Sequence, residues 1–352
     1  MKAWFQKQVL AWYKIHGRQH LPWKKALSPY RVWVSEIMLQ QTQVATVIPY
    51  FEKFMQSFTN IEALANANID SVLHHWAGLG YYARGRNLHK AAKMIVEDHA
   101  GQFPNTVEEL ITLPGIGLST AGAIVAQAFN KKATICDGNV KRVLSRFHCV
   151  KGALGQKDVE NTLWDLAVKY TPNEFVADYT QAMMDIGATL CTRTRPDCER
   201  CPLKTRCQAY KNNLQTAFPE RAKAKRLPLR QAHFLCAINS QQEILLTARP
   251  DKGIWGGLWC LPEFDSQAAL ESFVKGKLKS GKTLAKLPPL KHTFTHFHLT
   301  LKPLLLMHAK KLKTDTPEYK WVDTKMLKKL GVPAPIKKIL HYDIIEEKMR
   351  DL

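Results

Sequence analysis

Apolar positions in roughly the first two hundred residues recur at helical spacing. In the clearest example, Trp33, Glu36, Ile37 and Gln40 fall at i, i+3, i+4 and i+7, after a Ser28–Pro29 pair typical of a helix start. Glu36 therefore lies on the face that should be buried, whereas most glutamates lie on a solvated face. Because burial raises the pKa of a carboxyl group, Glu36 is a candidate general acid near neutral pH.

Two helices joined by a glycine hairpin form the segment around which the chain is organised. Thr106 and Glu109 make a capping box for the first helix, and Pro114 ends it. Gly115 and Gly117 supply a tight turn, and the N–H groups at the start of the second helix favour an anion such as a phosphate. A plain corner between two helices, without a ligand, explains these residues equally well.

A third helix is predicted downstream, where Cys136–Asn139 leads into apolar residues at helical spacing. Asp137 stands at its N-cap, and capping alone would explain the aspartate. The hairpin followed by this aspartate resembles the helix-hairpin-helix base-excision DNA glycosylases. That resemblance implies that the hairpin grips the DNA backbone and that Asp137 faces the sugar of an extruded nucleotide. The hairpin residues assigned to DNA contact are Gly115, Gly117 and Ser119.

Four of the eight cysteines lie close together in the sequence: Cys191, Cys198, Cys201 and Cys207. Four thiols at such spacing indicate a metal or cluster site, and both zinc and an iron–sulfur cluster accept four sulfurs. The spacing resembles the cluster loop of the endonuclease III and MutY families, which implies one 4Fe-4S cluster on these four ligands. Arginines and lysines crowd this loop, so we expect a structural role in DNA binding.

Beyond about residue 230 the pattern changes from helical to alternating. Residues 234–238 and 243–247 are predicted to be strands around a turn at 239–242, followed by the glycine-containing segment 255–262 and a helix over 267–279. This order resembles a Nudix-like domain. The Arg-Glu-x-x-Glu-Glu signature of Nudix hydrolases is absent, so we do not expect diphosphate hydrolysis.

These patterns predict a multidomain chain of α and α+β class. An all-α helix-hairpin-helix glycosylase domain would span 1–211 and include the iron–sulfur loop at 191–207. A basic linker with prolines would span 212–230. A Nudix-like α+β domain would span 231–352 and act in recognition.

The charge balance favours a polyanionic partner. Lys and Arg number 51 against 30 Asp and Glu, which gives a net charge of +21. Nucleic acid is the stronger interpretation and an anionic membrane surface the weaker one. No apolar run approaches the ~20 residues of a membrane span, and the first residues lack a signal-peptide pattern. We expect a cytoplasmic, nucleoid-associated monomer that binds double-stranded DNA.

Residues 35–44 closely resemble the catalytic segment of the MutY adenine DNA glycosylases. By that resemblance, Gln41 and Tyr81 enter the duplex around a mispair, and Gln181 lies near an adenine pocket. Tyr81 also lies close to Arg84 in the sequence, and aromatic side chains next to arginine suit stacking on bases. An aromatic corner of the core explains Tyr81 equally well.

Residues 292–299 alternate like a strand with three histidines on one face. A strand edge explains them, and a histidine metal site would lack accompanying acidic residues. The MutY family has a Phe-Ser-His loop that touches oxidised guanine, and Phe294, Thr295 and His296 match it. Thr295 keeps the hydroxyl of the serine and adds a methyl group.

The resemblance implies an enzyme that removes adenine mispaired with 8-oxoguanine or guanine and leaves an abasic site. The adenine would leave the base stack to be reached. Glu36 would protonate the departing base, and Asp137 would stabilise positive charge on the sugar. Gln19 and Lys24 lie in an aromatic loop near the expected pocket and receive no role beyond DNA contact.

Two alternatives remain open. An endonuclease III-like glycosylase/lyase carries a catalytic lysine two residues after the last hairpin glycine, where this chain has Ser119 and so lacks an amine for a Schiff base. Lys141 follows Asn139 on the third predicted helix, and we assign it to a phosphate contact. A DNA-binding protein without activity is the second alternative, against which Glu36 and Asp137 argue.

Overall fold

The computed structural model describes residues 1–220, 226–278, 285–309, 318–342 and 345. Contacts divide the chain into two compact units, one of residues 1–65 with 90–224 and the other of 66–89 with 225–352. The predicted boundaries instead kept residues 66–89 in the first domain. Leu73 gives the physical reason for the difference, because it is buried in the apolar core of the second unit.

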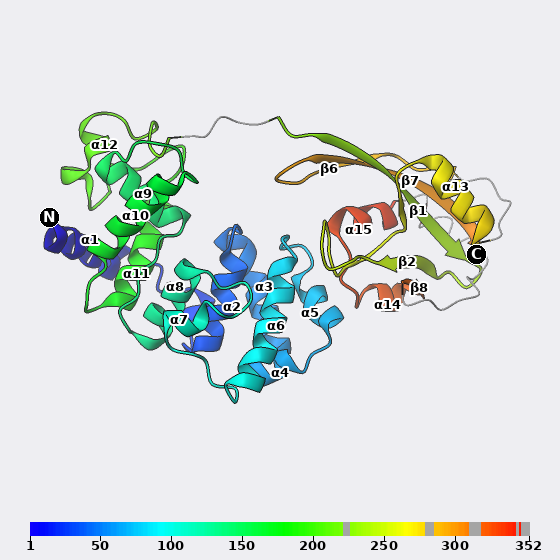
Figure 1. Ribbon diagram of the computed structural model, residues 1–352, viewed down its shortest axis with the longest axis horizontal. Coiled ribbons are helices and arrows are strands. Elements are labelled where there is room, and N and C mark those ends of the chain that lie inside the picture. The colour runs from blue at the N-terminus through cyan, green and yellow to red at the C-terminus, as the bar shows by residue number, and fades with distance from the viewer. Residues whose placement is uncertain (221–225, 279–284, 310–317, 343–344, 346–352) are drawn as a thin grey trace. The chain divides into compact units, whose positions relative to one another are not determined.

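The first unit is helical (Figure 1). Its elements are α1 (Lys2–His16), η1 (Pro22–Lys24), α2 (Pro29–Leu39), α3 (Val44–Ser57), α4 (Ile61–Ala65), α7 (Val107–Leu110), α8 (Leu118–Phe129), α9 (Gly138–His148), α10 (Lys157–Tyr170), α11 (Val176–Asp185), η2 (Ile186–Leu190), η3 (Lys204–Arg206) and α12 (Gln208–Lys211). Helix α5 (Ile69–Trp76) belongs to the second unit, and α6 (Ala83–Asp98) starts there.

The predicted helix starts are confirmed by their capping bonds. The Ser28 hydroxyl accepts from the Arg31 backbone N–H at 3.3 Å, and the Thr106 hydroxyl accepts from that of Glu109 at 3.3 Å. Asp137 caps α9 as predicted. Such caps satisfy N–H groups that the first helical turn leaves without partners.

The predicted hairpin lies between α7, a single turn, and α8. Gly115 has a φ of +83°, a conformation that side chains disfavour. Gly122 lets α8 approach the following segment closely, because a Cβ there would lie 2.1 Å from the carbonyl oxygen of Thr134. The chain that leads to Asp137 is therefore packed directly against the hairpin's second helix.

Aromatic rings hold the helices of the first unit together. Phe5 on α1 lies 5.0 Å from Phe147 on α9 and 4.3 Å from Tyr170 on α10, measured between ring centroids. All three belong to one buried apolar cluster. This cluster fixes α9, which Asp137 caps at its start.

A mixed sheet forms the centre of the second unit. Its strands are β1 (Leu229–Asn239), β2 (Ile244–Ala248), β3 (Trp259–Cys260), β4 (Glu263–Phe264), β5 (Ala285–Lys286), β6 (Leu290–Thr293), β7 (His298–Ala309) and β8 (Tyr319–Val322). The long strands β1 and β7 run parallel side by side (Figure 1). Its other helices are α13 (Gln267–Gly276), α14 (Thr324–Leu327) and α15 (Ala334–Leu340).

Alternate residues of β1 enter two different apolar cores. Phe234 and Cys236 pack in the core that includes Ile336 of α15, whereas Leu235 packs in the core that includes Leu270 of α13. Side chains alternate between faces along a strand, so the two helices cover opposite faces of the sheet. The predicted Nudix-like α+β layout is confirmed.

The prediction of one strand over residues 292–299 is wrong. Strand β6 ends at Thr293 and β7 begins at His298, and Phe294 N–H donates to the Phe297 carbonyl at 2.9 Å across the turn between them. Alternation of side chains did not distinguish a tight hairpin turn from a continuous strand. The three candidate recognition residues therefore lie in a turn.

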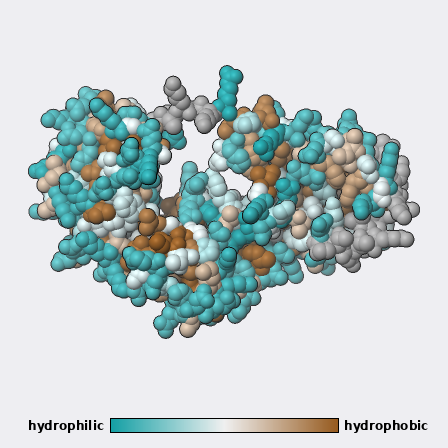
Figure 2. Space-filling view, in the orientation of Figure 1, coloured by the Kyte–Doolittle hydropathy of each residue, from teal (hydrophilic) through white to brown (hydrophobic). Residues whose placement is uncertain are grey.

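Among the described residues, no helix is long and apolar enough to cross a membrane. Figure 2 shows a mostly hydrophilic face, on which hydrophobic residues gather in small patches.

Candidate active site

Glu36 and Asp137 line the same pocket, which has a volume of about 580 Å³. Pockets of this size hold small organic ligands. Its other polar lining includes side chains from the α1–η1 loop, α8 and α11, among them Arg18, Ser119 and Gln181. The structure therefore brings together the two carboxylates and the Gln181 that the sequence singled out separately.

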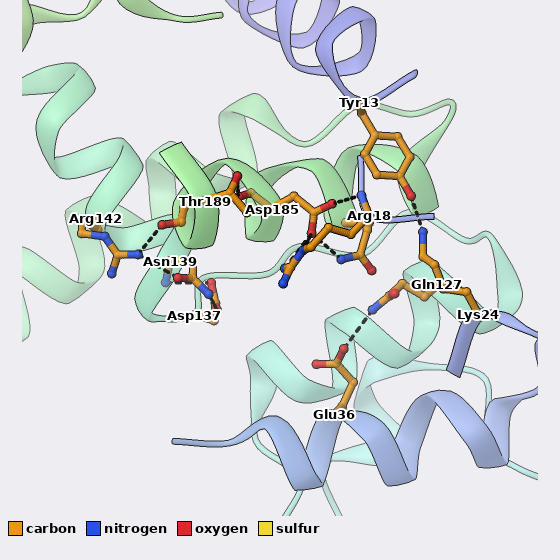
Figure 3. Close-up of polar contacts among 12 residues, drawn as sticks. Tyr13, Arg18, Lys24, Glu36, Gln127, Asp137, Asn139, Arg142, Asp185 and Thr189 are labelled. Atoms are coloured by element: carbon orange, nitrogen blue, oxygen red, sulfur yellow. Dashed lines mark hydrogen bonds and ion pairs between the residues drawn. The ribbon is translucent and has the colours of Figure 1, made fainter. Parts of the chain in front are cut away.

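Glu36 lies in the last turn of α2 and is partly exposed where it faces the pocket. Its Oε1 accepts a hydrogen bond from Nε2 of Gln127 at 3.1 Å (Figure 3). Burial raises the pKa of Glu36 to about 7; nearby Asp137 raises it as well, and the Gln127 hydrogen bond opposes both. Near neutral pH, both the acid and the carboxylate forms of Glu36 are therefore available, as acid–base catalysis requires.

Asp137 is held by donors on both carboxylate oxygens. Its Oδ1 accepts from the backbone N–H groups of Asn139 at 3.1 Å and Val140 at 2.9 Å, and its Oδ2 accepts from the Asn139 side chain at 3.0 Å. N–H groups at the start of a helix interact favourably with negative charge. Asp137 is thus suited to face a developing cation.

A buried carboxylate, Asp185, connects two side chains of the pocket. It accepts from Arg18 through the backbone N–H at 2.8 Å and through Nε at 2.9 Å, and it forms an ion pair with Nη2 at 2.8 Å. Gln181 Nε2 donates to the same carboxylate at 2.8 Å. Figure 3 shows Asp185 and Arg18 directed toward each other. Asp185 therefore fixes both neighbours at the pocket.

Lys24 lies close to this network, with its amine against the Tyr13 hydroxyl (Figure 3). Burial lowers the pKa of Lys24, and nearby Asp185 opposes that effect. Lys24 therefore lies within electrostatic reach of both Asp185 and Arg18. Gln19 lies beside Arg18 in the sequence and is exposed.

The predicted backbone contacts lie around the hairpin. A Cβ at Gly117, which directly precedes α8, would meet no atom within 4 Å, so this turn is open. Ser119 accepts from the Cys136 backbone N–H at 3.0 Å and thereby connects α8 to the segment of Asp137. Lys141 pairs with Glu160, so a phosphate would compete with that carboxylate for its amine.

Gln41 and Tyr81 share an unusual backbone conformation. Their φ values are +56° and +47°, which non-glycine residues adopt rarely. Gln41 is exposed beyond the end of α2, and Tyr81 is 43% exposed in the second unit. The Arg84 guanidinium lies 5.5 Å from the Tyr81 ring centroid and donates to the Leu79 carbonyl at 3.1 Å. Tyr81 is therefore exposed rather than part of a core corner.

The four clustered cysteines line a common pocket beside α9: Cys191, Cys198, Cys201 and Cys207. Buried Arg146 donates to the Cys191 sulfur at 3.3 Å and to the Thr192 carbonyl at 2.7 Å. Burial raises the pKa of the Cys201 thiol to about 12. Within the described residues, no three Cys, His, Asp or Glu side chains could hold a single metal ion.

The candidate recognition residues lie on an aromatic support. The Phe294 ring centroid is 5.5 Å from that of Trp255, 4.6 Å from that of His292 and 4.7 Å from that of Phe297. Thr295 and His296 are exposed at the turn. The support holds Phe294 in place while its two neighbours remain accessible.

From the sequence, neither Gln127 nor Arg18 was identified as a residue of the site, and Asp185 was assigned no role. Gln127, Arg18 and Asp185 act through contacts with residues far away in the chain. The sequence signal that could have indicated Gln127 is a single polar residue in an apolar helical segment, since it follows Val125 and Ala126 on α8. Its partner was not deducible, since Glu36 lies 91 residues earlier.

Comparison with protein families gives two matches. Residues 34–169 match the sequence model of the HhH-GPD superfamily of base excision DNA repair proteins. Residues 233–342 match that of the NUDIX domain. The first match includes Glu36 and Asp137, and the second includes the turn that carries Phe294.

Curated relatives match almost the whole chain. The chain is 39% identical over 339 residues to the adenine DNA glycosylase of Buchnera aphidicola subsp. Schizaphis graminum, covering 96% of this chain and 97% of that protein. It is 32% identical to the adenine DNA glycosylase of Homo sapiens, covering 95% of this chain and 73% of that protein.

Solved structures match the helical part. A thermostable thymine-DNA glycosylase has 26% identity and a TM-score of 0.53, covering 60% of this chain and 97% of its own. An endonuclease III in a non-covalent DNA complex has 20% identity and a TM-score of 0.52, covering 60% and 96%. The helical fold is thus that of the base-excision glycosylases.

Proposed function

This chain belongs to the adenine DNA glycosylase family, and we propose that it removes adenine opposite 8-oxoguanine or guanine in double-stranded DNA. The observation that carries the proposal is that Glu36 and Asp137 line one pocket, with the pKa of Glu36 raised to about 7. A binding protein has no need of an acid tuned to neutral pH. The two carboxylates fit cleavage of an N-glycosidic bond.

In this proposal each carboxylate has a different task. Glu36 donates a proton to a ring nitrogen of the extruded adenine, and its carboxylate form then activates water. Asp137 stabilises the positive charge that develops on the sugar as the bond lengthens. Asp185 holds Arg18 and Gln181 in place, and these two side chains line the pocket and orient the base by polar contacts.

We propose that the enzyme is monofunctional. The Ser119 hydroxyl accepts from the Cys136 N–H and offers no amine to the sugar. A Ser119→Lys variant should gain borohydride trapping on DNA and strand nicking. If neither appears, Ser119 does not occupy the lyase position.

We propose that the four cysteines hold one 4Fe-4S cluster. The four cysteines line one pocket beside α9, so their sulfurs are available to ligate one shared group there. Buried Arg146 would complement the negative charge of thiolate ligands. The cluster would supply structural stability to the basic loop. Anaerobically purified protein should be brown and contain iron, and one zinc without iron would reject the cluster.

We propose that the second unit recognises the base opposite the adenine. Adenine itself is normal DNA, so the partner base must mark the damage. The turn residues Thr295 and His296 are exposed and can reach a ligand, and Phe294 is supported by Trp255. Gln41 and Tyr81 are exposed side chains suited to entering the duplex beside the mispair.

A duplex assay tests the proposed reaction. The protein is incubated with duplexes that carry a single adenine opposite 8-oxoguanine, guanine or thymine, or an oxidised pyrimidine, and strand breakage is compared with and without alkali. We expect alkali-dependent breakage at the adenine of the two mispairs only. Breakage without alkali at oxidised pyrimidines would indicate the glycosylase/lyase alternative, and no breakage would indicate a binding protein.

A further inference from the structure

Gln127 is an unusual residue for its position. It is 8% exposed and ends a stretch of α8, residues 121–127, in which every residue is buried. A buried amide is costly unless it is hydrogen-bonded. Its Nε2 donates to Oε1 of Glu36 at 3.1 Å, which satisfies one of its groups on the carboxyl of the candidate acid.

We propose that Gln127 is a positioning residue whose side-chain N–H holds Oε1 of Glu36 and favours the carboxylate form of that side chain. This inference rests on the proposed function, in which Glu36 is the general acid. An N–H donor stabilises a carboxylate more than it stabilises a neutral carboxyl group. Figure 3 shows the second oxygen of Glu36 directed away from Gln127, which leaves that oxygen for the proton and the substrate.

The other groups around Glu36 do not replace Gln127. Burial and the negative charge of Asp137 both raise the pKa of Glu36, and the Gln127 bond lowers it. Of the remaining pocket lining, Ser119 and Gln181 are neutral, and Arg18 is paired with Asp185. The charged and titratable groups facing the pocket or packed behind it are Arg18, Asp137, Asp185, Lys24 and Tyr13.

The test uses the full chain with its glutamate side-chain carboxyl carbons labelled with ¹³C. The resonance of Glu36 is identified by its loss in Glu36→Gln, and its titration is followed by NMR. Gln127→Met keeps the length of the side chain and removes the N–H. We expect the Glu36 titration to move upward by about one pH unit, the size expected when a carboxylate loses one charge-assisted hydrogen bond. The fall of single-turnover excision with pH should move by the same amount.

Gln6→Met is the matched control. Gln6 is a partly buried glutamine of the same unit, and its Nε2 donates to the Tyr170 carbonyl at 3.0 Å. This variant loses a hydrogen bond of the same kind outside the pocket. It should leave the Glu36 titration and the pH profile unchanged.

An unchanged Glu36 titration in folded Gln127→Met would overturn the proposal and leave Gln127 a packing residue. A downward shift would overturn it as well, because the amide would then present its oxygen to Glu36. If Gln127→Met does not fold, Gln127→Glu replaces it. Two carboxyls in contact should titrate in separated steps, one above the native value, and a single native titration would contradict the contact. Normal excision by Glu36→Gln would reject the proposed function, while the NMR titration would still test the contact.

Discussion

The polar side chains around Glu36 are buried and hydrogen-bonded, whereas those in the turn at Phe294 are exposed. In the pocket, Asp185 is fully buried and Gln127 nearly so, and each is bonded to another polar group. At the turn, Thr295 and His296 are exposed, and only the aromatic Phe294 is packed. The two regions belong to different compact units.

The contrast follows from what each region would do. An acid that works near pH 7 needs a desolvated carboxyl, because desolvation raises its pKa, and the buried polar neighbours that surround it must themselves be hydrogen-bonded. A site that recognises a DNA base needs hydrogen-bond donors and acceptors that are exposed and can bond to that base. Changes in the first region should therefore affect all substrates, and changes in the second should affect discrimination.

The largest effect is expected from Glu36→Gln. Gln keeps the size and hydrogen bonding of the side chain but is a far weaker acid, so single-turnover excision should fall by at least ~10²-fold. Binding to the mispaired duplex should persist, measured by gel shift. Glu62→Gln, an exposed change on α4, serves as the control. Near-normal excision by Glu36→Gln would remove Glu36 from the mechanism.

The raised pKa of Glu36 predicts a pH dependence. Because the acid form is needed, excision should fall about tenfold per pH unit above a pH of about 7. The free energy of unfolding should also fall as the pH rises. A carboxyl with a raised pKa stabilises the folded state fully below its unfolded pKa of 4.5, and this contribution is lost as the pH rises through about 7. Measured by urea unfolding, the free energy of unfolding of the native protein relative to that of Glu36→Gln should fall by up to ~3 kcal/mol between pH 4.5 and about pH 7. A flat profile between pH 6 and 8 would contradict the raised pKa.

Asp185→Asn tests whether Asp185 holds the pocket side chains Arg18 and Gln181 in position. The change keeps the shape but removes the charge that holds Arg18, so the positions of Arg18 and Gln181 should loosen. We expect excision on both mispairs to fall about tenfold. Unfolding free energy should fall by about 2 kcal/mol, less than for a fully buried pair, because the Arg18 side chain is 21% exposed.

The matched control for that change is Asp165→Asn, which alters an exposed aspartate on α10. It should leave both excision and unfolding unaffected. Loss of stability in Asp185→Asn without any change in excision would limit Asp185 to folding.

The smallest and most selective effect is expected from Phe294→Ala combined with His296→Ala. The preference for adenine opposite 8-oxoguanine over guanine should fall about fivefold, the low end of the ~1–3 kcal/mol that a base contact contributes to discrimination. Single-turnover rates on the two duplexes measure it. Lys291→Ala on the exposed edge of β6 is the control. Equal losses on both mispairs would mean that the turn supports DNA affinity only.

Local signals in the sequence predicted those parts of the fold and site that depend on neighbouring residues. The N-cap at Ser28, the capping box at Thr106, the N-cap at Asp137 and the alternation of β1 each involve residues within a few positions of one another. The alternation of residues 292–299 predicted one strand and so missed the turn at 294–297, which only the resemblance to a Phe-Ser-His loop indicated.

The sequence by itself determined the helix that carries Glu36, the hairpin and the helix that Asp137 caps, the first strands of the second unit, and which four cysteines are grouped. Only the tertiary structure decided that residues 66–89 pack with the second unit, that Gln127 bonds to Glu36, and that Asp185 holds Arg18 across 167 residues of chain. Periodicity and capping report interactions within one or two turns, whereas these contacts depend on how separate helices pack. Their polar partners therefore leave no regular spacing in the sequence.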